Sequence, residues 1–448
     1  MKLADLVLPV CVVCGAFADG HGDEGTSAEI VYQWNIVEYE WPNDTLKQQE
    51  IENKAYIPQN SAINGIKLYK GKVYVTVPRL KPGVPSTLNV IIKAPAGSNG
   101  SSHLLRPFPN WEMQKLGNCE ALQRVQSMEI DPNTGYMWIV DTGYISKMED
   151  VDVQPVDSCP AKIIIYDLNT NQEVNRYVFP RMVIGFGLFY LNDIVLGYSE
   201  NVARYAFLSD TLDYKLVVYD YKENTSYAYS HSNMRADEQY INITISNLTL
   251  TGIITGINGI AMSPDFKYIY YSSVAGVGLH QIETSVLTSA NGNSAAFAAA
   301  VRTIGEKVSP GDGMAYGAKN NLYYSALGPN AIFKWDISKD LGSSGDFNAV
   351  PLISQSELVS DPRMQWVDTL ALDDNGYLWF TTSRLNKFFS SEGIVHHEPN
   401  FFIWKIFVDD VHYLKGRQDV PTLGSQKTLA SCFALIICAC LQRFLTLT

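Results

Sequence analysis

The chain has 448 residues, of which 46% are hydrophobic and 18% charged, and its 34 basic and 46 acidic residues give a formal net charge of −12. This is the composition of a globular protein rather than a disordered one, and the acidic balance argues against nucleic acid as a partner. The 26 Tyr and 8 Trp residues favour a β-rich fold, because aromatic side chains pack well on pleated sheets.

The first residues have the pattern of a secretory signal peptide. Lys2 supplies a positive charge, Leu6–Val13 forms an apolar core, and Ala16-Phe17-Ala18 offers small residues before a cleavage point. We therefore predict a signal peptide over 1–18 and a secreted, extracellular protein. Asn-x-Ser/Thr sequons agree with secretion and are candidate glycosylation sites, namely Asn43, Asn99, Asn224, Asn242 and Asn247.

One pattern recurs six times: a hydrophobic strand, a turn rich in Gly, Asn and Asp, and an aromatic strand. The copies occupy 65–79, 128–143, 188–220, 259–284, 313–335 and 369–384. A period of roughly 50 to 70 residues indicates blades of about four strands, since one small sheet cannot bury both of its faces alone. We predict an all-β fold, a six-bladed β-propeller with a central channel, over 19–415. Val31–Trp41 is expected to be a strand that completes the last blade and removes an exposed sheet edge.

Two of the seven cysteines, Cys119 and Cys159, lie in this body. In an oxidising compartment they most simply form one disulfide. Because no CxxC pair or His cluster accompanies these two cysteines, we predict neither a metal site nor a cofactor. The tail, 416–448, is hydrophobic over Leu429–Leu441, which is shorter than the ~18–20 residues of a membrane-spanning helix. Membrane contact through this tail is an alternative that the short run does not favour.

Polar residues recur where each innermost strand is expected to begin. Only the third repeat, with Phe186-Gly187-Leu188, departs from a triplet of one polar, one small and one apolar residue. The side chains that occupy the polar position would form a partial ring of oxygens at one mouth of the channel, which suits an ammonium group or a hard cation. The alternative is that Asn, Asp and Gly only make the turn that enters each strand. The triplets are Asn64-Gly65-Ile66, Gln126-Ser127-Met128, Asn258-Gly259-Ile260, Asp312-Gly313-Met314 and Asp368-Thr369-Leu370.

Several short phrases follow one another in a fixed order from about Tyr32 to Arg384. They are Val77-Pro78-Arg79 followed by 83–89 (GVPSTLN), Leu105–Trp111, Asn118-Cys119-Glu120, Met137–Gly143, Ser209-Asp210 and Gly259–Pro264. As an ordered set they resemble the yellow / major royal jelly protein family of secreted proteins. The resemblance implies a six-bladed propeller, glycosylation and a ligand site at one mouth of the channel. Depending on the member, it also implies dopachrome conversion in melanin formation, binding of biogenic amines such as serotonin and dopamine, or a food or structural role.

The resemblance also draws attention to the fifth repeat. Family members commonly carry a second cysteine pair with one cysteine before the Trp of this repeat, whereas this chain reads Phe333-Lys334-Trp335. Asn330 lies at a position similar to the family's ligand-contacting segment, and Phe333 and Trp335 either add an aromatic face for a ligand or pack within the blade.

Other polar residues have simpler readings. Asp141-Thr142-Gly143 and Ser209-Asp210 are expected to staple strand ends by hydrogen bonds from side chain to backbone. Arg79 and Arg384 either bind anions or, more simply, pair with the acidic surface.

These observations lead to a binding function and an enzymatic alternative. We expect a secreted protein that binds a small aromatic or amine ligand of the catecholamine, indolamine or dopachrome type at the channel mouth, with a role in pigment formation. The alternative is a dopachrome-converting isomerase, whose base would be Asp312 or Asp368 if burial raises its pKa. A structural or nutritive role stays open.

Overall fold

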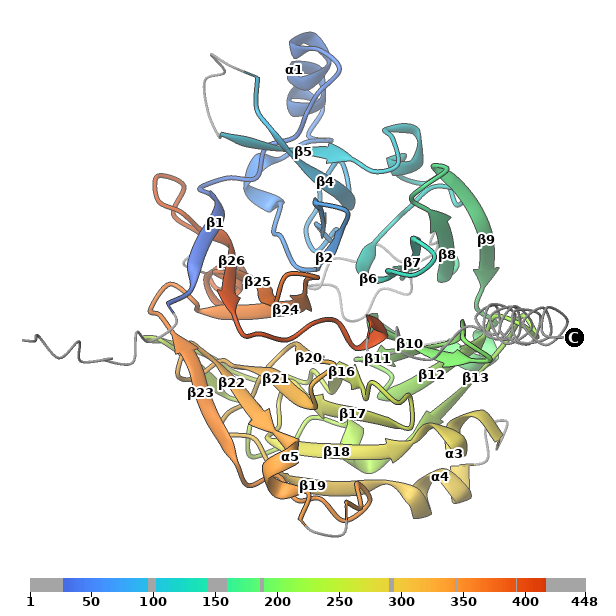
Figure 1. The fold of residues 1–448 in the computed structure, drawn as a ribbon. Coiled ribbons are helices and arrows are strands. Elements are labelled where there is room, and N and C mark those ends of the chain that lie inside the picture. The colour runs from blue at the N-terminus through green and yellow to red at the C-terminus, as the bar shows by residue number, and fades with distance from the viewer. Residues whose placement is uncertain are drawn as a thin grey trace, which may run out of the picture.

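The computed structural model describes residues 27–95, 102–143, 159–185, 189–289, 294–342, 345–391 and 393–415. The predicted signal peptide, the tail and the sequon at Asn99 lie outside these residues. Six four-stranded antiparallel sheets stand around one axis, as Figure 1 shows, which confirms the predicted six-bladed propeller. Within the described ranges, every helix is too short or too polar to span a bilayer.

Each blade is a sheet of four strands, and the first strand of the sheet lies nearest the axis while the fourth lies at the outside. The innermost strands of neighbouring blades contact one another in a closed circle. The first three blades contain β2 (Ile66–Tyr69), β3 (Lys72–Thr76), β4 (Leu88–Lys93) and β5 (His103–Pro107); β6 (Val125–Asp131), β7 (Tyr136–Asp141), β8 (Lys162–Asp167) and β9 (Gln172–Val178); β10 (Leu191–Ser199), β11 (Val202–Asp210), β12 (Lys215–Asp220) and β13 (Thr225–Ser230).

The last three blades follow the same plan. They contain β16 (Ile257–Met262), β17 (Tyr268–Ser273), β18 (Gly278–Glu283) and β19 (Arg302–Glu306); β20 (Met314–Tyr316), β21 (Asn321–Ala326), β22 (Ala331–Asp336) and β23 (Gln355–Ser360); β24 (Trp366–Leu372), β25 (Tyr377–Ser383), β26 (Phe401–Phe407) and β1 (Glu29–Trp34). Burial decreases outward along a blade: every residue of β6 is buried, whereas most of β9 is exposed or half-buried.

The N-terminal strand closes the ring. β1 pairs antiparallel with β26, from Glu29 opposite Lys405 to Trp34 opposite Phe401, so the predicted completion of the last blade is confirmed. The strand ends at Trp34 rather than Trp41, because the chain then turns to the first blade, where Tyr39 forms a bridge with Leu105. Trp34 is buried and its indole donates to the carbonyl of His103 at 2.9 Å. The sixth blade is therefore tied to the first.

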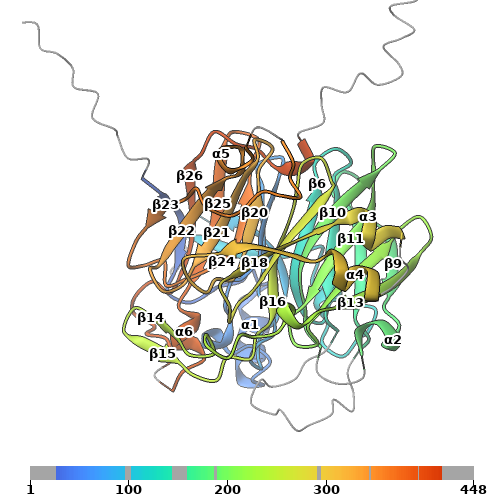
Figure 2. The same cartoon turned by 90° about the horizontal axis from the view of Figure 1, so that it is seen from below.

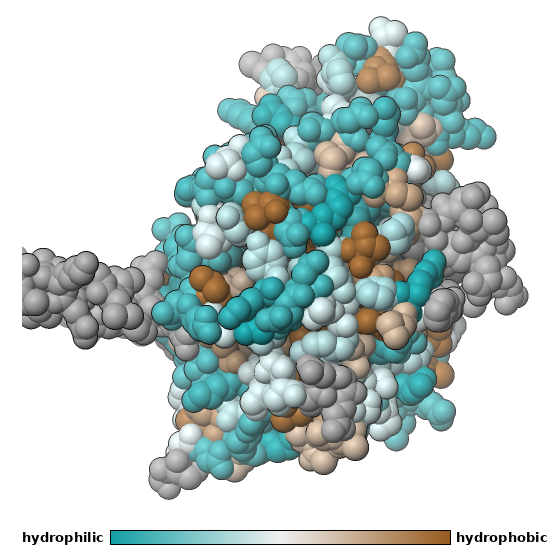
Figure 3. All heavy atoms as spheres, turned by 90° about the vertical axis from the view of Figure 1, so that its right-hand side faces the viewer, coloured by the Kyte–Doolittle hydropathy of each residue, from teal (hydrophilic) through white to brown (hydrophobic). Residues whose placement is uncertain are grey.

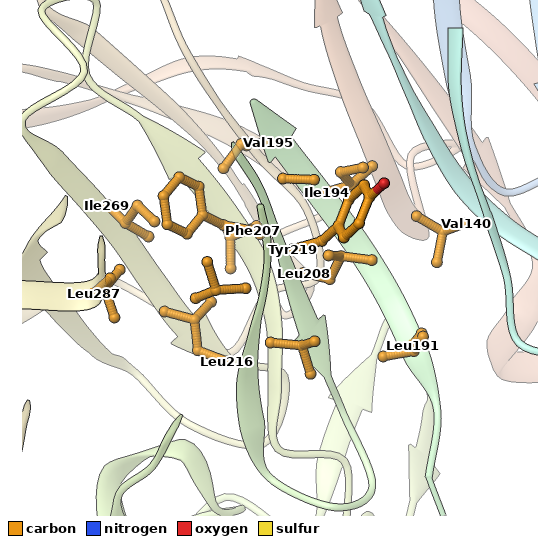
Figure 4. Packing of buried hydrophobic residues seen from close by; sticks show 14 of the residues in the cluster. Val140, Leu191, Ile194, Val195, Phe207, Leu208, Leu216, Tyr219, Ile269 and Leu287 are labelled. Carbon is orange, nitrogen blue, oxygen red and sulfur yellow. The ribbon is translucent and has the colours of Figure 1, made fainter. Parts of the chain in front are cut away.

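The core lies between the blades. Figure 4 shows part of the cluster around the third blade, where side chains of β10, β11 and β12 pack against Val140 of β7, Ile269 of β17 and Leu287 of the short helix α3 (Thr284–Ser289). Burying each such aliphatic side chain contributes about 1.5–3 kcal/mol. Alternate residues of one strand can serve two neighbouring blades, because successive side chains point to opposite faces.

A short Ala-rich helix, α4, spans Ser294–Ala300. It lies within the fourth blade, between β18 and β19, and the ring of Phe297 stacks on Tyr229 of β13 at 4.9 Å between centroids. The helix therefore fills the space between the third and fourth blades.

The two faces of the propeller carry different connections, as Figure 2 shows. One face carries α1 (Asp44–Glu52), α6 (Leu385–Phe388) and a hairpin of β14 (Ile243–Ile245) and β15 (Leu248–Leu250). The described C-terminal end lies at the other face. There the segment after β26 crosses the centre of the ring, where it is red in Figure 1, and the carbonyl of Val411 accepts from the backbone N–H of Ala318 at 2.9 Å.

Two further predictions concern the covalent structure. Cys119 and Cys159 form a disulfide, as predicted, which joins the segments that precede β6 and β8. The four described sequons are exposed, as an acceptor for a glycan must be, and their modification stays a prediction; they are Asn43, Asn224, Asn242 and Asn247. Figure 3 shows hydrophobic residues only as separate spots on the side that it presents, so its coloured residues form no continuous apolar patch there.

Candidate functional site

The predicted mouth residues lie at equivalent ends of five innermost strands, on the face that carries the hairpin β14–β15. Gln126, Asn258 and Asp368 lie near the start of β6, β16 and β24, whereas Asn64 and Asp312 precede β2 and β20 by two residues. All five are buried. The side-chain amide of Asn64 donates to Asp368 Oδ2 at 3.0 Å, across the junction of the first and sixth blades.

The third blade also contributes to this mouth, which corrects the alignment of Phe186-Gly187-Leu188 with the other triplets. These three residues lie outside the described chain, and the innermost strand begins at Leu191. Ile194 pairs with Leu208 of β11, just as Ile260 of the fourth blade pairs with Tyr271 of β17. The equivalent triplet is therefore Asn192-Asp193-Ile194, which restores a polar residue in every blade.

Asp193 adds a third carboxyl group that the sequence analysis missed. It occupies the position that is Gly, Ser or Thr in the other five blades. It accepts hydrogen bonds from the hydroxyl of Ser127 and the backbone N–H of Ile260, both at 3.3 Å. Asp193 thereby joins the innermost strands of the second, third and fourth blades.

Hydroxyl groups of the second strands hold the mouth residues of the next blade. The Oγ1 atom of Thr76 donates to the carbonyl of Gln126 at 2.9 Å, and the Oγ atom of Ser209 donates to the carbonyl of Asn258 at 2.7 Å. Thr381 donates in the same way to the carbonyl of Asn64 at 2.5 Å. These bonds fix the backbone and leave the amide side chains for other partners.

The carboxyl groups of Asp312 and Asp368 interact with each other and have neutral hydrogen-bond donors. Trp366 Nε1 donates to Asp312 Oδ2 at 2.6 Å, and the hydroxyl of Thr369 donates to Asp368 Oδ1 at 3.0 Å. Neither carboxyl has an ion-pair partner within 4 Å in the described part of the chain. A buried carboxylate without a partner favours its protonated form.

The pKa values of these carboxyl groups follow from that environment. Burial raises the pKa of Asp312 to about 7, and the charge of Asp193 acts in the same direction while Lys307 opposes it. Burial and then the charge of Asp312 raise the pKa of Asp368 well above its usual range. Burial also raises the pKa of Asp193 to about 6. The raised pKa values mean that Asp312 is only partly ionised near neutral pH, and a bound cation would favour its ionised form.

An aromatic side chain connects this acidic pair to a buried arginine. The hydroxyl of Tyr190 donates to Gln126 Oε1 at 2.5 Å, and the guanidinium of Arg124 lies 4.6 Å from the centre of the Tyr190 ring. Burial raises the pKa of Tyr190; the charge of Arg124 lowers it, and those of Asp368 and Asp312 raise it. Arg124 and both carboxyl groups therefore act on one tyrosine.

A buried lysine, Lys307, also acts on Asp312. The amino group of Lys307 is 5.9 Å from the ring centre of Tyr324, and burial lowers its pKa to about 7 against the effect of Asp312. Sequence alignment missed Arg124, Tyr190 and Lys307, because all three stand outside the repeated triplets.

The hairpin β14–β15 packs against the mouth-side ends of the last blades. Ile243 and Ile245 belong to one buried cluster with residues from the mouth-side ends of the last three blades, among them Leu327, Trp366 and Leu385. α6 also contacts β15, as Figure 2 shows. The mouth residues are themselves buried, so a ligand can reach them only if neighbouring side chains or loops move.

Asn330 lies at the rim of the mouth rather than in the ring. It occupies the turn between β21 and β22 with φ of 53°, and its amide donates to the hydroxyl of Ser246 in the hairpin at 3.2 Å. A ligand contact of Asn330 stays a prediction. Trp335 is fully buried and donates to Asp340 Oδ2 at 2.7 Å, so the packing interpretation is confirmed for it. Phe333 stacks on Tyr324.

The remaining predictions have clear outcomes. Asp141 staples a strand end as predicted, since it accepts from the backbone N–H groups of Gln123, Arg124 and Gly143. The interpretation of Arg79 as an anion ligand or a surface partner is wrong, because its buried guanidinium donates only to backbone carbonyls, those of Val84, Pro85, Gln114, Leu122 and Gln123. Arg384 forms an ion pair with Glu398.

The channel beyond the mouth is nearly filled. Lys67 Nζ lies 3.0 Å from Glu129 Oε2, and His412 Nε2 lies 3.2 Å from Glu129 Oε1. The open space among these side chains amounts to about 20 Å³, which is room for roughly one water molecule. Among the described residues, no group of three or more His, Cys, Asp or Glu side chains is arranged to hold a metal ion. The channel itself is therefore too full to hold an organic ligand.

Comparison with known proteins gives a consistent result. The family model described as Major royal jelly protein matches residues 123–414. Protein yellow of Drosophila erecta is 28% identical over 263 residues, which cover 57% of this chain and 47% of that protein. Major royal jelly protein 8 of Apis mellifera is 26% identical over 286 residues, with coverage of 62% and 66%. The chain thus spans about half the length of the yellow proteins that it matches.

A solved structure of a luciferin-regenerating enzyme aligns with 87% of this chain and 97% of its own, at 10% identity and a TM-score of 0.46. Similarity at this level carries no argument about function.

Proposed function

The chain belongs to the yellow / major royal jelly protein family, and from that premise we propose that it is a secreted protein that binds a small aromatic amine at the mouth of its channel. A role in melanin or other pigment formation is part of this proposal. The ligand would be of the catecholamine, indolamine or dopachrome type.

The observation that carries the proposal is a set of buried oxygens that lack a cation. Asp312 and Asp368 have no ion-pair partner in the described part of the chain, and Asn64 Oδ1 is buried without a hydrogen-bond partner. An ammonium group has three donors and one positive charge. An ammonium group would therefore donate to these acceptors. It would also offset the free-energy cost of burying two carboxyl groups without a positive charge.

Two aromatic side chains support an aromatic ligand. Trp366 is hydrogen-bonded to Asp312, and Tyr190 is hydrogen-bonded to Gln126. Trp366 therefore contacts the acidic pair directly, and the charges of both carboxyl groups act on Tyr190. Either ring can contact a catechol or an indole at this mouth. Gln126 and Asn258 provide further amide groups at the same mouth for ring hydroxyls.

The test is titration calorimetry of the secreted full-length chain with dopamine and serotonin. We expect saturable binding, and we expect Asp312→Asn and Asp368→Asn each to weaken it at least about tenfold, the loss typical of one charge-assisted contact. Asp409→Asn is the matched control, because Asp409 is an exposed aspartate that pairs with Lys319 outside the mouth and already has φ of 52°. Heat changes indistinguishable from dilution at millimolar ligand would contradict the proposal.

A dopachrome-converting isomerase is the second candidate. It is favoured by the pKa of Asp312, which burial raises to about 7 and so into the range of an effective general base at neutral pH. The test follows the bleaching of dopachrome with the wild-type protein and with Asp312→Asn. The enzymatic assignment requires a rate above the protein-free control that falls in the variant, and equal rates for both proteins would count against it.

A further inference from the structure

Arg124 is a buried cation whose hydrogen-bonding capacity is only partly used. Its side chain is 1% exposed, and its Nε and Nη2 atoms are buried without hydrogen-bond partners in the described part of the chain. A guanidinium group carries five donors and keeps its charge at any physiological pH. Leaving such a group buried and unpaired is unfavourable, so an anion that reached it would be bound strongly.

The neighbourhood of Arg124 offers no free anion. Asp141, which binds the backbone of Arg124, forms a buried ion pair with Lys162 at 2.8 Å. The same carboxylate accepts backbone N–H bonds from Gln123, Arg124 and Gly143. Asp141 is therefore fully used in holding the strand ends, and it is the backbone of Arg124 that it binds.

A second buried arginine shows that the fold can satisfy all the nitrogen atoms of a buried guanidinium group. Arg79 lies in the same part of the molecule, and its Nε, Nη1 and Nη2 atoms all donate to backbone carbonyls. Arg79 therefore acts as a structural group with every nitrogen satisfied. Arg124 differs because its guanidinium instead lies over the ring of Tyr190, at the edge of the mouth.

The positive and negative groups meet at Tyr190. Arg124 lies 4.6 Å from the centre of its ring, while its hydroxyl binds Gln126, one of the mouth residues. The charges of Asp368 and Asp312 reach the same hydroxyl. The mouth thus places an unpaired cation and an unpaired acidic pair around one aromatic side chain.

We propose that the ligand of this mouth is a free α-amino acid with an aromatic side chain, whose carboxylate binds Arg124 while its ammonium group binds Asp312 and Asp368. The inference rests on the proposed function and specifies its ligand. An amine without a carboxylate satisfies only the acidic pair and leaves Arg124 buried and unpaired. The zwitterion satisfies both, and its side-chain ring lies beside Tyr190 and Trp366.

The experiment compares ligands that differ only in the carboxylate: L-DOPA with dopamine, and L-tryptophan with tryptamine, by titration calorimetry on the full-length chain at neutral pH. We expect each amino acid to bind at least about tenfold more tightly than its amine, the gain from one charge-assisted guanidinium–carboxylate contact. Arg124→Gln should abolish this preference while leaving the affinity for dopamine within about twofold, and Arg124→Lys should retain part of the preference. Arg181→Gln, at an exposed arginine, is the control and should change neither affinity.

The outcomes separate this inference from the function on which it rests. Saturable binding of dopamine without a preference for L-DOPA would overturn the amino-acid assignment and leave the amine site intact. If none of the four ligands binds, both the amino-acid assignment and the amine site are overturned. A loss of both affinities in a folded Arg124→Gln protein would assign Arg124 a positioning role and would likewise overturn the inference. If that variant does not fold, the two wild-type comparisons decide the question.

Discussion

At Asp312 the proposed function and the stability of the fold favour different protonation states. Binding of a cation favours the ionised carboxylate, whereas burial favours the neutral acid. Its pKa is raised from 3.8 to about 7, chiefly by burial, so the folded state holds this proton more tightly than the unfolded state. The free energy of unfolding must then fall as the pH rises from about 4 to about 7, where the folded protein loses the proton. The ligand-free protein carries this cost at neutral pH.

We therefore expect Asp312→Asn to be more stable than the wild type at pH 7.5, by about 1 kcal/mol or more, with the difference shrinking toward pH 4. The amide keeps the acceptor for Trp366 Nε1 and removes the ionisation. Thermal unfolding of both proteins at the two pH values measures the difference. A variant that is less stable than the wild type at pH 7.5 without ligand would show that the carboxylate is compensated within the protein.

The same ionisation couples ligand binding to pH. A cationic ligand favours the ionised carboxyl pair, so its binding must release protons, and affinity for dopamine should rise by about tenfold between pH 6 and pH 8. Asp193 acts in the same direction, and so does Lys307, which loses charge near pH 7. Calorimetry in two buffers of different ionisation enthalpy counts the released protons. An affinity for dopamine that does not change between pH 6 and pH 8 would contradict the release of protons on binding.

The sequence predicted mouth residues but not the groups around them, for a physical reason. Asn64, Gln126, Asn258, Asp312 and Asp368 repeat at one position of each blade, so an alignment of repeats finds them. Arg124, Tyr190 and Lys307 reach the mouth from positions that do not repeat. Their burial and proximity depend on tertiary packing, and the unused donors of Arg124 become visible only in three dimensions.

The hairpin β14–β15 is the element whose opening we expect to admit a ligand, because it packs against Trp366 at the mouth-side ends of the last blades. Ile245 is a fully buried residue of this hairpin, which has only three residues in each strand. Two-stranded hairpins are marginally stable on their own, so this one depends on the packing of its apolar face.

Ile245→Ala should loosen the hairpin more than the propeller. We expect faster hydrogen exchange over 243–250 and a several-fold faster association of the ligand, because local opening requires less free energy than global unfolding. Stopped-flow measurement of tryptophan fluorescence follows association through Trp366. Thr249→Ala, at an exposed position of the same hairpin, is the control. An unchanged association rate in Ile245→Ala would mean that the ligand enters by another route.

The first strand is the element on which ring closure depends. Trp34 is 1% exposed and bonds to the first blade, while its strand pairs with the sixth. Trp34→Ala should lower the free energy of unfolding by about 3–5 kcal/mol, and Trp34→Phe by clearly less, because the smaller side chain leaves a cavity. Urea denaturation measures both. Equal, small losses would show that the strand pairing alone maintains closure.

At the scale of elements, the sequence predicted the positions of the strands more accurately than it predicted which strands of different blades are equivalent. The aromatic second strands and their turns carry local signals, so β7, β17 and β25 match the expected stretches. The third innermost strand was misplaced because Phe186-Gly187-Leu188 resembles the apolar start of a repeat. Only the pairing of Ile194 with Leu208 reveals the true register.

At the scale of the whole molecule, Glu129 links parts of the chain that are distant in sequence. It lies in β6, pairs with Lys67 of β2 and receives His412 from the segment that crosses the channel. Burial alone would raise the pKa of Glu129, but the charges and hydrogen bonds of Lys67 and His412 lower it to about 2. This contribution to stability is present above about pH 4.5 and is lost as the pH falls toward 2, opposite to that of Asp312.

Glu129→Gln should therefore destabilise the protein at pH 7 by about 3–5 kcal/mol, because it leaves Lys67 buried without its counter-ion. The loss should shrink at pH 3, and the double variant Glu129→Gln, Lys67→Met should recover part of it. Urea denaturation at both pH values is the measurement. A single variant as stable as the wild type at pH 7 would show that Lys67 reaches solvent.

The pairing of β1 with β26 also sets the order of events during biosynthesis. Asn400 donates to the carbonyl of Asn35 across 365 residues of sequence, and a nascent chain emerges from its N-terminus. The earliest strand must therefore wait, unpaired, until nearly the entire body has been translated. A message truncated anywhere before the codon for Phe401 would deprive β1 of its partner and leave the circle open, so even a late premature stop should be as damaging as an early one.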